Sequence, residues 1–320
     1  MEYVEKKKVN IASISLYLGI VLVFVVFEMV CILCGKKFIT INNIFNIITQ
    51  SSITSIIAIG ASLVIITGGI DLSVGSIVGF VGILGGLLIK NQTPLFASVL
   101  LCIIAGALLG LANGILVSYG KVPSFIVTLG TMQAVRGLAL LINGGQPVSA
   151  FPPGLEKIMC TKLFSAIPIA IVYVLISYAL MVFVMGSTRF GRYVYAFGGN
   201  KNAARLSGVA TKRIELFVYI LCGIFAAIGG VMLLSRLTYA DPNAGSGYEM
   251  NAIAATVIGG ISLSGGRGKL INTLIGAILL STLTSGLQIL NVATYYQSIV
   301  VGVVIVAAVF ADKQKERKSE

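Results

Sequence analysis

Thr67-Gly68-Gly69-Ile70-Asp71-Leu72-Ser73-Val74-Gly75-Ser76 is the stretch that decides the fold class, because it lies between two long apolar runs. It places a carboxylate, hydroxyl groups and three glycines where hydrocarbon side chains would otherwise continue. An ionisable side chain at membrane depth costs about 2.5–3.5 kcal/mol on insertion scales, so it is expected to face protein or a water-filled path. The stretch therefore predicts a protein that moves a polar solute across a bilayer.

The composition is that of a membrane protein. Of the 320 residues, 57% are hydrophobic and only 11% are charged, and the mean hydropathy is +1.00, whereas soluble domains carry about 25% charged residues. We therefore predict an all-α integral membrane protein with about ten transmembrane helices, forming one transmembrane domain over residues 1–320. Some apolar runs are shorter than the ~20 residues of a straight span; the runs are Ile11–Cys34, Ile44–Ile66, Leu72–Ile89, Pro94–Tyr119, Ser124–Ile142, Ala166–Met185, Ile214–Leu234, Ala252–Leu263, Leu270–Leu290 and Tyr296–Ala311.

Glycine is spread through these apolar runs. The chain has 37 glycines, among them the four-residue spacings Gly75-x-x-x-Gly79 and Gly82-x-x-x-Gly86. In lipid, such small residues let helix backbones approach one another closely. We expect most of the glycines to serve packing.

The distribution of basic residues predicts the orientation. With the N-terminus inside, 16 of the 23 Lys and Arg residues lie on the inner side, 6 lie on the outer side, and Arg136 lies within a span. By the positive-inside rule, both the N- and the C-terminus are predicted to be cytoplasmic. This topology accounts for the formal net charge of +12, so the charge implies contact with membrane lipid and no nucleic-acid partner.

Several kinds of chemistry are excluded by the sequence. The chain has no histidine, so acid–base catalysis and metal ligation by imidazole are ruled out. Its five cysteines lie in or beside apolar runs, and Cys31-x-x-Cys34 has no second pair with which to bind a metal. No Gly-x-x-x-x-Gly-Lys-Ser/Thr loop is present to bind ATP. We predict no catalytic residue, no metal and no cofactor in this chain.

A second stretch resembles the first. Gly259-Gly260-Ile261-Ser262-Leu263-Ser264-Gly265-Gly266 matches residues 68–75 at six of eight positions, and both stretches join an inward-going run to an outward-going one. Interrupted helices at corresponding places in two halves indicate a substrate path between them. The candidate path residues are Gly68, Gly69, Asp71, Ser73, Gly259, Gly260, Ser262 and Ser264. The alternative for Asp71 is that it caps the next helix through backbone N–H groups.

The longest internal loop, residues 187–213, contains a short helical pattern. Asn200 can cap a helix that includes Ala203 and Ala204, and Gly208 can end it. The sequence predicts an amphipathic helix flanked by basic residues, either a docking peg for a cytoplasmic partner or a solvated loop whose charges only fix the topology.

At this point a family resemblance becomes clear. The residue 69–76 stretch, the Gly198–Gly208 loop and Gly247-Tyr248-Glu249-Met250-Asn251-Ala252-Ile253-Ala254-Ala255 resemble the permease subunits of bacterial ABC sugar importers, and most closely the ribose permeases. The likeness covers nearly the whole chain, from Phe38-Ile39-Thr40-Ile41-Asn42-Asn43 to Tyr295-Tyr296-Gln297.

The resemblance implies a multi-pass subunit of the bacterial cytoplasmic (inner) membrane that is no enzyme and forms a homodimer. It would take a monosaccharide, ribose first, from an extracytoplasmic sugar-binding protein and couple to a cytoplasmic ABC ATPase, which uses ATP and Mg. Its coupling helix would comprise Asn200, Ala203, Ala204, Arg205, Ser207 and Gly208. Its outer loops, Asn143–Ser165 and Leu237–Glu249, would meet the binding protein, the second through Asp241, Tyr248 and Glu249.

One other class of transporter stays open. An ion-coupled secondary transporter of a small polar solute needs a titrating carboxylate at depth. Glu28 and Asp71 are the two candidates for that role.

Overall fold

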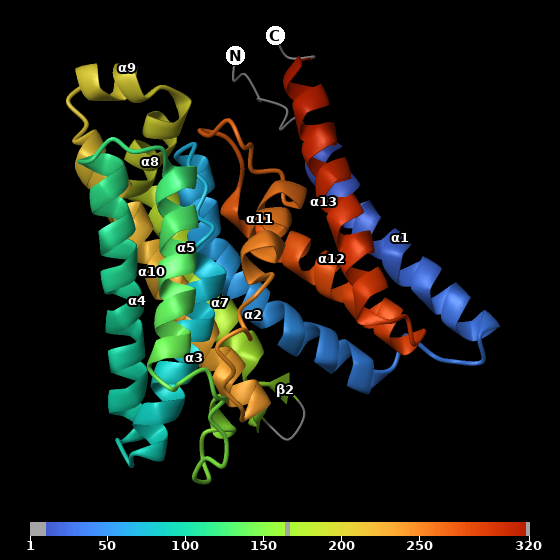
Figure 1. Cartoon of the computed structure of the whole chain (residues 1–320). Helices are drawn as coiled ribbons and strands as arrows, with labels where there is room; N and C mark the ends of the chain where they lie inside the picture. Colours follow the sequence, from blue (N-terminus) through green and yellow to red (C-terminus); the bar gives the residue numbers. More distant parts are fainter. Residues whose placement is uncertain (1–10, 164–166, 318–320) are drawn as a thin grey trace.

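The computed structural model describes residues 11–163 and 167–317, which form a bundle of helices (Figure 1). Most helices coincide with the apolar runs of the sequence, and the longest non-helical stretches lie between α5 and α6, between α10 and α11, and between α11 and α12. The elements are α1 (Ile11–Leu33), α2 (Ile41–Ile66), α3 (Val74–Lys90), α4 (Leu95–Ser118), α5 (Ser124–Leu141), α6 (Lys157–Cys160), β1 (Lys162–Leu163), β2 (Ile167–Pro168), α7 (Ala170–Ser187), α8 (Arg189–Gly199), α9 (Lys201–Leu206), α10 (Thr211–Leu237), α11 (Tyr248–Ile258), α12 (Leu270–Ile289) and α13 (Thr294–Arg317).

Six helices in the described part of the chain are long and apolar enough to cross a membrane: α2, α4, α5, α7, α10 and α12. Three shorter apolar stretches lie in α1, α3 and α13. The remaining predicted span, Ala252–Leu263, overlaps α11 (Tyr248–Ile258), a helix of 11 residues. At 1.5 Å per residue it covers roughly 16 Å, about half of the ~30 Å hydrocarbon core.

Helix α2 forms the centre of the bundle. Every residue from Ser51 to Ile66 is buried, and α7, α10, α11 and α12 pack around this half of the helix. Hydroxyl groups link it to its neighbours: Ser62 Oγ lies 3.2 Å from Thr256 Oγ1 of α11, and Tyr178 Oη of α7 donates to the Ser55 carbonyl at 3.2 Å. These hydrogen bonds pair polar groups for which lipid chains offer no partner.

Helices α4 and α10 pack backbone to backbone. Gly106, Gly110 and Gly114 recur at four-residue spacing on α4, and a Cβ atom on Gly106 would lie 2.5 Å from the carbonyl oxygen of Gly223 on α10. A Cβ atom on Gly110 would overlap the carbonyl oxygen of Tyr219. The close approach predicted for glycine is confirmed at this helix pair, where van der Waals contact and interhelical fit hold the bundle together.

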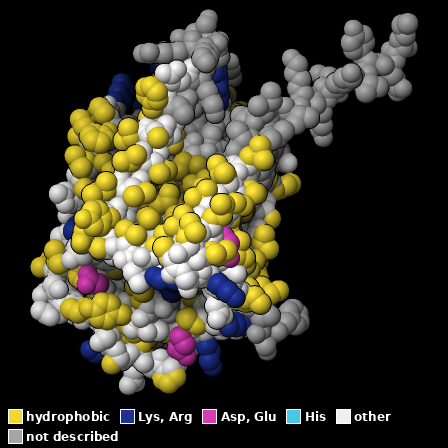
Figure 2. Space-filling view, turned by 90° about the vertical axis from the view of Figure 1, so that its right-hand side faces the viewer, with side chains coloured by type: hydrophobic (Ala, Val, Ile, Leu, Met, Phe, Trp, Pro, Cys, Tyr) yellow, Lys and Arg dark blue, Asp and Glu magenta, His cyan; other side chains and the backbone are white. Residues whose placement is uncertain are grey.

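The outer surface of the bundle is apolar. Large hydrophobic side chains are exposed along α1, α4, α7 and α13, for example Leu108, Phe183 and Val303. Figure 2 shows hydrophobic side chains dominating the middle of one face, while most visible charged side chains lie toward its lower part. A surface of this kind suits contact with lipid chains.

The two ends of the bundle differ. Helices α8 and α9 lie at one end, called here the α9 end, together with the start of α1 and the last turns of α13 (Figure 1). At the opposite end, the predicted loop Asn143–Ser165, of which residues 164 and 165 lie outside the described part, contains the short α6, and β1 pairs with β2 in antiparallel register. Prolines and exposed polar residues disfavour longer helices there. This strand pair and an isolated antiparallel bridge between Val148 and Ala240 are the β structure in the described residues.

Replacing Gly110 tests the α4–α10 contact. The variant Gly110→Ala is expected to lower the thermal unfolding temperature in detergent, because an overpacked site costs about 1–3 kcal/mol. Gly186→Ala on α7 is the matched control, since nothing lies within 4 Å of its Cβ position. Equal unfolding temperatures for the two variants would contradict the packing described for α4 and α10.

Candidate functional site

The first broken segment begins where α2 ends. Gly68 has a φ of +77°, and its N–H donates to the Ile65 carbonyl at 2.8 Å while the Gly69 N–H donates to the Val64 carbonyl at 3.0 Å. This pair of bonds closes the helix in a Schellman motif, for which glycine is preferred because the left-handed conformation strains other residues. Residues 68–73 then continue without helical structure until α3 starts at Val74.

A chain of buried polar side chains holds this segment. Asp71 Oδ1 accepts from both the N–H (2.8 Å) and the hydroxyl (2.6 Å) of Ser73. The Ser73 hydroxyl accepts from Asn113 Nδ2 of α4 at 2.9 Å, and Asn113 Oδ1 accepts from the hydroxyl of Thr131 on α5 at 2.6 Å. Asp71 is 2% exposed, and Asn113 and Ser73 are fully buried. Asp71 therefore bonds within its own segment, just ahead of the first turn of α3.

Helix α5 also binds the backbone of the segment. The Ile70 N–H donates to the hydroxyl of Ser124 at 3.2 Å, and the Thr128 hydroxyl donates to the Ile70 carbonyl at 3.1 Å. Non-helical backbone at membrane depth is tolerated where protein satisfies its polar groups. The residues Asn113, Ser124, Thr128 and Thr131 were not among the sequence candidates; a small polar side chain inside an apolar run was their only sequence indication.

The second broken segment starts in the same way. Gly260 has a φ of +82° and donates to the Val257 carbonyl at 2.8 Å, and the Ile261 N–H donates to the Thr256 carbonyl at 3.2 Å. Gly260 therefore occupies the place that Gly68 has after α2, which is one residue off the alignment of the two sequence stretches. The segment is also longer than the first, because α12 starts only at Leu270.

The path residues predicted from the sequence fall into buried and exposed sets. Asp71, Ser73, Gly259 and Ser262 are buried, Gly69 is half-buried, and Gly68, Gly260 and Ser264 are exposed. The buried members hold the two segments in place. A role of this set in lining a path stays a prediction.

The two broken segments meet at the end of α2. The Ile66 carbonyl, the last of the helix, accepts from the Gly266 N–H at 2.8 Å. A Cβ atom on Gly198, near the end of α8, would overlap the same carbonyl oxygen. The Tyr195 hydroxyl on α8 donates to the Gly268 carbonyl at 3.0 Å, and burial raises the pKa of this phenol, which keeps it a proton donor at neutral pH. We call this contact of Ile66, Gly198 and Gly266 the glycine junction.

Helix α9 follows the glycine junction directly. Asn200 Oδ1 accepts from the Ala203 N–H at 2.9 Å, and the helix closes with bonds from the Gly208 N–H to Arg205 and from the Val209 N–H to Ala204. The predicted short helix, its Asn200 cap and its end at Gly208 are confirmed. Of its residues only Ala204 is buried, while Leu206, which the sequence analysis did not select, is 84% exposed. An exposed leucine on a polar helix is a candidate contact for a partner.

The segment after α10 returns along α3. A Cβ atom on Gly86 would lie 3.3 Å from the Ala240 Cβ, one on Gly79 would lie 2.5 Å from the Pro242 carbonyl oxygen, and one on Gly75 would overlap the Glu249 carboxylate. These glycines lie on different turns of α3, so residues 240–247 and the start of α11 run from the end opposite α9 into the bundle. The glycines of α3 therefore leave room for non-helical backbone, and not only for the close packing of another helix.

Arg136 stabilises this returning segment. Its Nη1 on α5 donates to the Pro242 carbonyl at 3.2 Å. A charged side chain inside a span is thereby bonded to backbone that has no helical partner. Asp241 lies half-buried toward the end of the bundle, whereas the Glu249 Oε2 atom is buried against α3. The contact of Asp241, Tyr248 and Glu249 with a binding protein stays a prediction.

Comparison with known proteins identifies the family. The family described as "branched-chain amino acid transport system / permease component" matches residues 43–309. The chain belongs to this family of ABC transporter permeases. The permease is 40% identical over 285 residues to the ribose import permease protein RbsC of Escherichia coli (strain K12), covering 88% of this chain and 89% of the relative. No solved structure matches it.

Two further relatives extend the comparison. The permease is 39% identical over 313 residues to RbsC of Bacillus subtilis (strain 168), covering 97% of both chains. It is 38% identical over 282 residues to the D-allose transport system permease protein AlsC of Escherichia coli (strain K12), covering 88% of this chain and 86% of the relative.

Family membership confirms several expectations. The chain is a multi-pass membrane permease and not itself an ATPase, and nucleotide chemistry belongs to a separate subunit. Glu28, one of the two carboxylates considered for ion coupling, accepts from the N–H groups of Phe38 and Ile39 at 3.0 and 2.7 Å and so fixes the turn after α1.

Two adjacent glycines test the glycine junction. Gly198→Ala is expected to reduce uptake of the transported solute severalfold, because the new Cβ would push α8 away from the Ile66 carbonyl. Gly199→Ala should leave uptake near the level of the original protein, since nothing lies within 4 Å of its Cβ position. If the two variants transport equally at equal membrane levels, the contact has no part in transport.

Replacing Arg136 tests the anchor of the returning segment. Arg136→Met is expected to speed hydrogen–deuterium exchange in residues 240–247, because the Pro242 carbonyl loses its donor. A hydrogen bond to a charged group contributes about 1.5–3 kcal/mol, so exchange should rise roughly tenfold or more. Arg136→Lys, which keeps a charged donor, should give a smaller change; identical exchange in all three proteins would refute the anchoring role.

Proposed function

We propose that this permease is the membrane subunit of an ATP-driven importer for a monosaccharide, with ribose as the first candidate. The observation that carries the proposal is the glycine junction, which joins both broken segments to the helix that precedes α9. The identity to two ribose permeases and a D-allose permease supports a sugar substrate. The sugar is taken from an extracytoplasmic binding protein, and the α9 end faces the cytoplasm.

The orientation follows from charge and from the position of α9. The basic residues Lys201, Arg205, Lys212 and Arg213 cluster in and after α9, which agrees with a cytoplasmic end. The opposite end then carries Asn143–Ser165 and the loop around Asp241, which are proposed to receive the binding protein. A second copy of the chain completes the transport path as a homodimer.

The chain makes and breaks no covalent bond in this mechanism. A partner ATPase that binds α9 moves α8 and α9 together, since Asn200 both ends α8 and caps α9. The glycine junction passes this movement to the ends of α2 and of the residue 259–269 segment. ATP binding then shifts the population between two states of the bundle. The size of the shift is set by the difference between the affinities of the two states for ATP.

The experiment that tests this function is sugar-stimulated ATP hydrolysis. The permease is reconstituted in liposomes with its cognate ATPase and binding protein, and ribose is compared with allose and other monosaccharides. Stimulation by ribose supports the whole proposal. Stimulation by another sugar alone retains the importer and rejects ribose, and absence of stimulation by any sugar in an assembled complex rejects a sugar importer.

Leu206 provides a test of the α9 docking surface. Leu206→Ser is expected to weaken assembly with the ATPase about tenfold to a hundredfold, because burying a leucine contributes about 1.5–3 kcal/mol. The Leu206→Met variant keeps an apolar side chain of similar volume and should assemble normally. Co-purification and titration of the ATPase onto permease in nanodiscs give the measurement. Unchanged binding of Leu206→Ser would place the ATPase elsewhere.

A further inference from the structure

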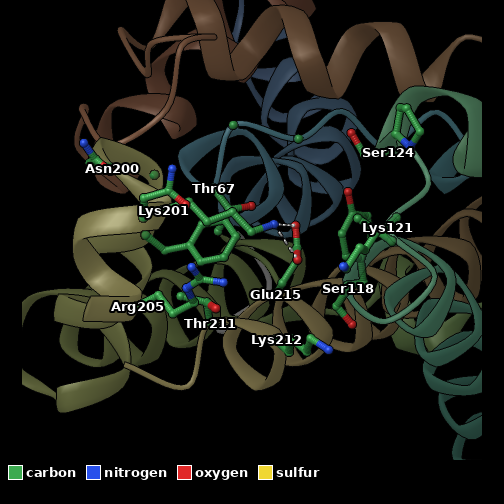
Figure 3. A pocket seen from close by; sticks show the side chains of 18 of the residues that line it. Thr67, Ser118, Lys121, Ser124, Asn200, Lys201, Arg205, Thr211, Lys212 and Glu215 are labelled. Carbon is green, nitrogen blue, oxygen red and sulfur yellow. Dashed lines mark hydrogen bonds and ion pairs between the residues drawn. The ribbon is translucent and has the colours of Figure 1, made fainter. Parts of the chain in front are cut away.

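A cavity of about 630 Å³ opens at the α9 end of the permease (Figure 3). Its walls come from five places: the end of α2, the end of α4 with the α4–α5 loop, α8 with α9, the first turns of α10, and Ser264 of the residue 259–269 segment. The volume lies within the roughly 300–1,000 Å³ of small-molecule sites. It is therefore a site in which a ligand can contact α9 and the bundle at once.

The charges that line the cavity do not balance. Lys121, Lys201, Arg205 and Lys212 are basic, and Glu215 is the one acidic residue among the lining residues. Glu215 pairs with Lys201, whose Nζ lies 3.0 and 3.1 Å from the two carboxylate oxygens. In the described residues this is the only ion pair, so Lys121, Arg205 and Lys212 remain without a carboxylate partner in an ion pair.

Neutral hydrogen-bonding groups accompany these cations. The hydroxyls of Thr67, Ser118, Ser124 and Thr211 belong to the cavity wall. Those of Thr67 and Ser118 donate to the Val64 and Gly114 carbonyls, which leaves Ser124 and Thr211 to donate to a ligand. Figure 3 shows side chains from α9, from the α4–α5 loop and from α10 arranged around one space. Cations with hydroxyl donors are the groups that bind phosphate oxygens.

We propose that this cavity binds a phosphate-bearing anion, supplied either as the headgroup of an anionic phospholipid of the cytoplasmic leaflet or as a soluble phosphate compound. The inference rests on the proposed orientation, which places the α9 end in the cytoplasm. Basic pockets between transmembrane helices on that side suit lipid phosphates. A single carboxylate side chain of a partner protein would fill only a small part of the volume, which favours a larger ligand.

The position of the site gives the ligand a structural effect. Arg205 belongs to α9, whereas Lys121 precedes α5 and Lys212 lies in the first turn of α10. A phosphate bound among these three cations cross-links α9 to the bundle by electrostatic attraction. Bound anion therefore stabilises the arrangement of α9 described here and resists its displacement.

The test uses the full-length permease alone. Purified protein is placed in nanodiscs of phosphatidylcholine, with or without phosphatidylglycerol, and its unfolding temperature is measured with and without inorganic pyrophosphate. The double variant Lys121→Gln/Lys212→Gln removes two cations of the cavity and spares α9 and the broken segments. The control Arg189→Gln/Arg213→Gln removes two cations at the same end that do not line the cavity.

The expected result is that anion stabilises the original protein and the control, while the cavity variant binds roughly tenfold more weakly. Stabilisation by phosphatidylglycerol and not by pyrophosphate identifies lipid as the source; stabilisation by pyrophosphate in pure phosphatidylcholine identifies a soluble phosphate. No stabilisation by either, or equal loss in both variants, overturns the site. Because no sugar, ATPase or binding protein is present, this outcome is separable from failure of the importer proposal.

Discussion

The carbonyl of Ile66 is the constraint on which the rest of this structure depends. It is the last carbonyl of α2, and the Schellman motif that closes the helix satisfies the carbonyls before it but leaves this one. An unpaired carbonyl away from water is costly, so a donor must approach from another segment. The Gly266 N–H is that donor. The need to pair one backbone group thus brings the two broken segments together.

The same carbonyl explains why glycine is required on the approaching segments. Gly198 and Gly266 are both so close to neighbouring backbone that a side chain on either would collide with it. Contact without side chains is short and stiff, so a displacement of α8 cannot be absorbed by rotation of a side chain. We expect this stiffness to connect α9 to α2, so that a short helix with five exposed residues can influence a buried one.

Much of the fold is predictable because its determinants are local. Apolar run length predicts the helices, and a glycine after an apolar run predicts the ends of α2 and α11. Asn200 and Gly208 predict the bounds of α9 because capping uses groups a few residues apart. The short α11 could also be anticipated from its run length, though the returning segment before it could not. Residues 240–247 carry no pattern that distinguishes an external loop from backbone inside the bundle.

What escaped the sequence analysis depends on contacts between distant residues. Arg136 inside a span indicates only that it needs a partner, and the partner, the Pro242 carbonyl, is 106 residues away. Asn113, Ser124 and Thr131 are ordinary small polar residues in the sequence. In the fold, Ser124 bonds Ile70, Asn113 bonds Ser73, and Thr131 bonds Asn113. The one-residue offset between the two broken segments shows the same limit. The sequence alignment matches Gly260 to Gly69, whereas the residue that closes α2 in the same left-handed conformation is Gly68.

These contacts also decide which parts of the bundle can move. The residue 68–73 segment is bonded to α4 and α5 through side chains. The end of α2 is bonded to the residue 259–269 segment through backbone at the glycine junction. Separating α8 from α2 would change the glycine junction and leave the side-chain bonds to α4 and α5 intact. The backbone contacts and the side-chain bonds therefore need not break together. Helix α4 is fixed to α10 by glycine packing, which makes that pair the frame. We therefore expect movement in α8, α9 and the residue 259–269 segment, because their contacts with the end of α2 are made by backbone. The ion pair between Lys201 and Glu215 of α10 would have to break for α9 to leave this frame.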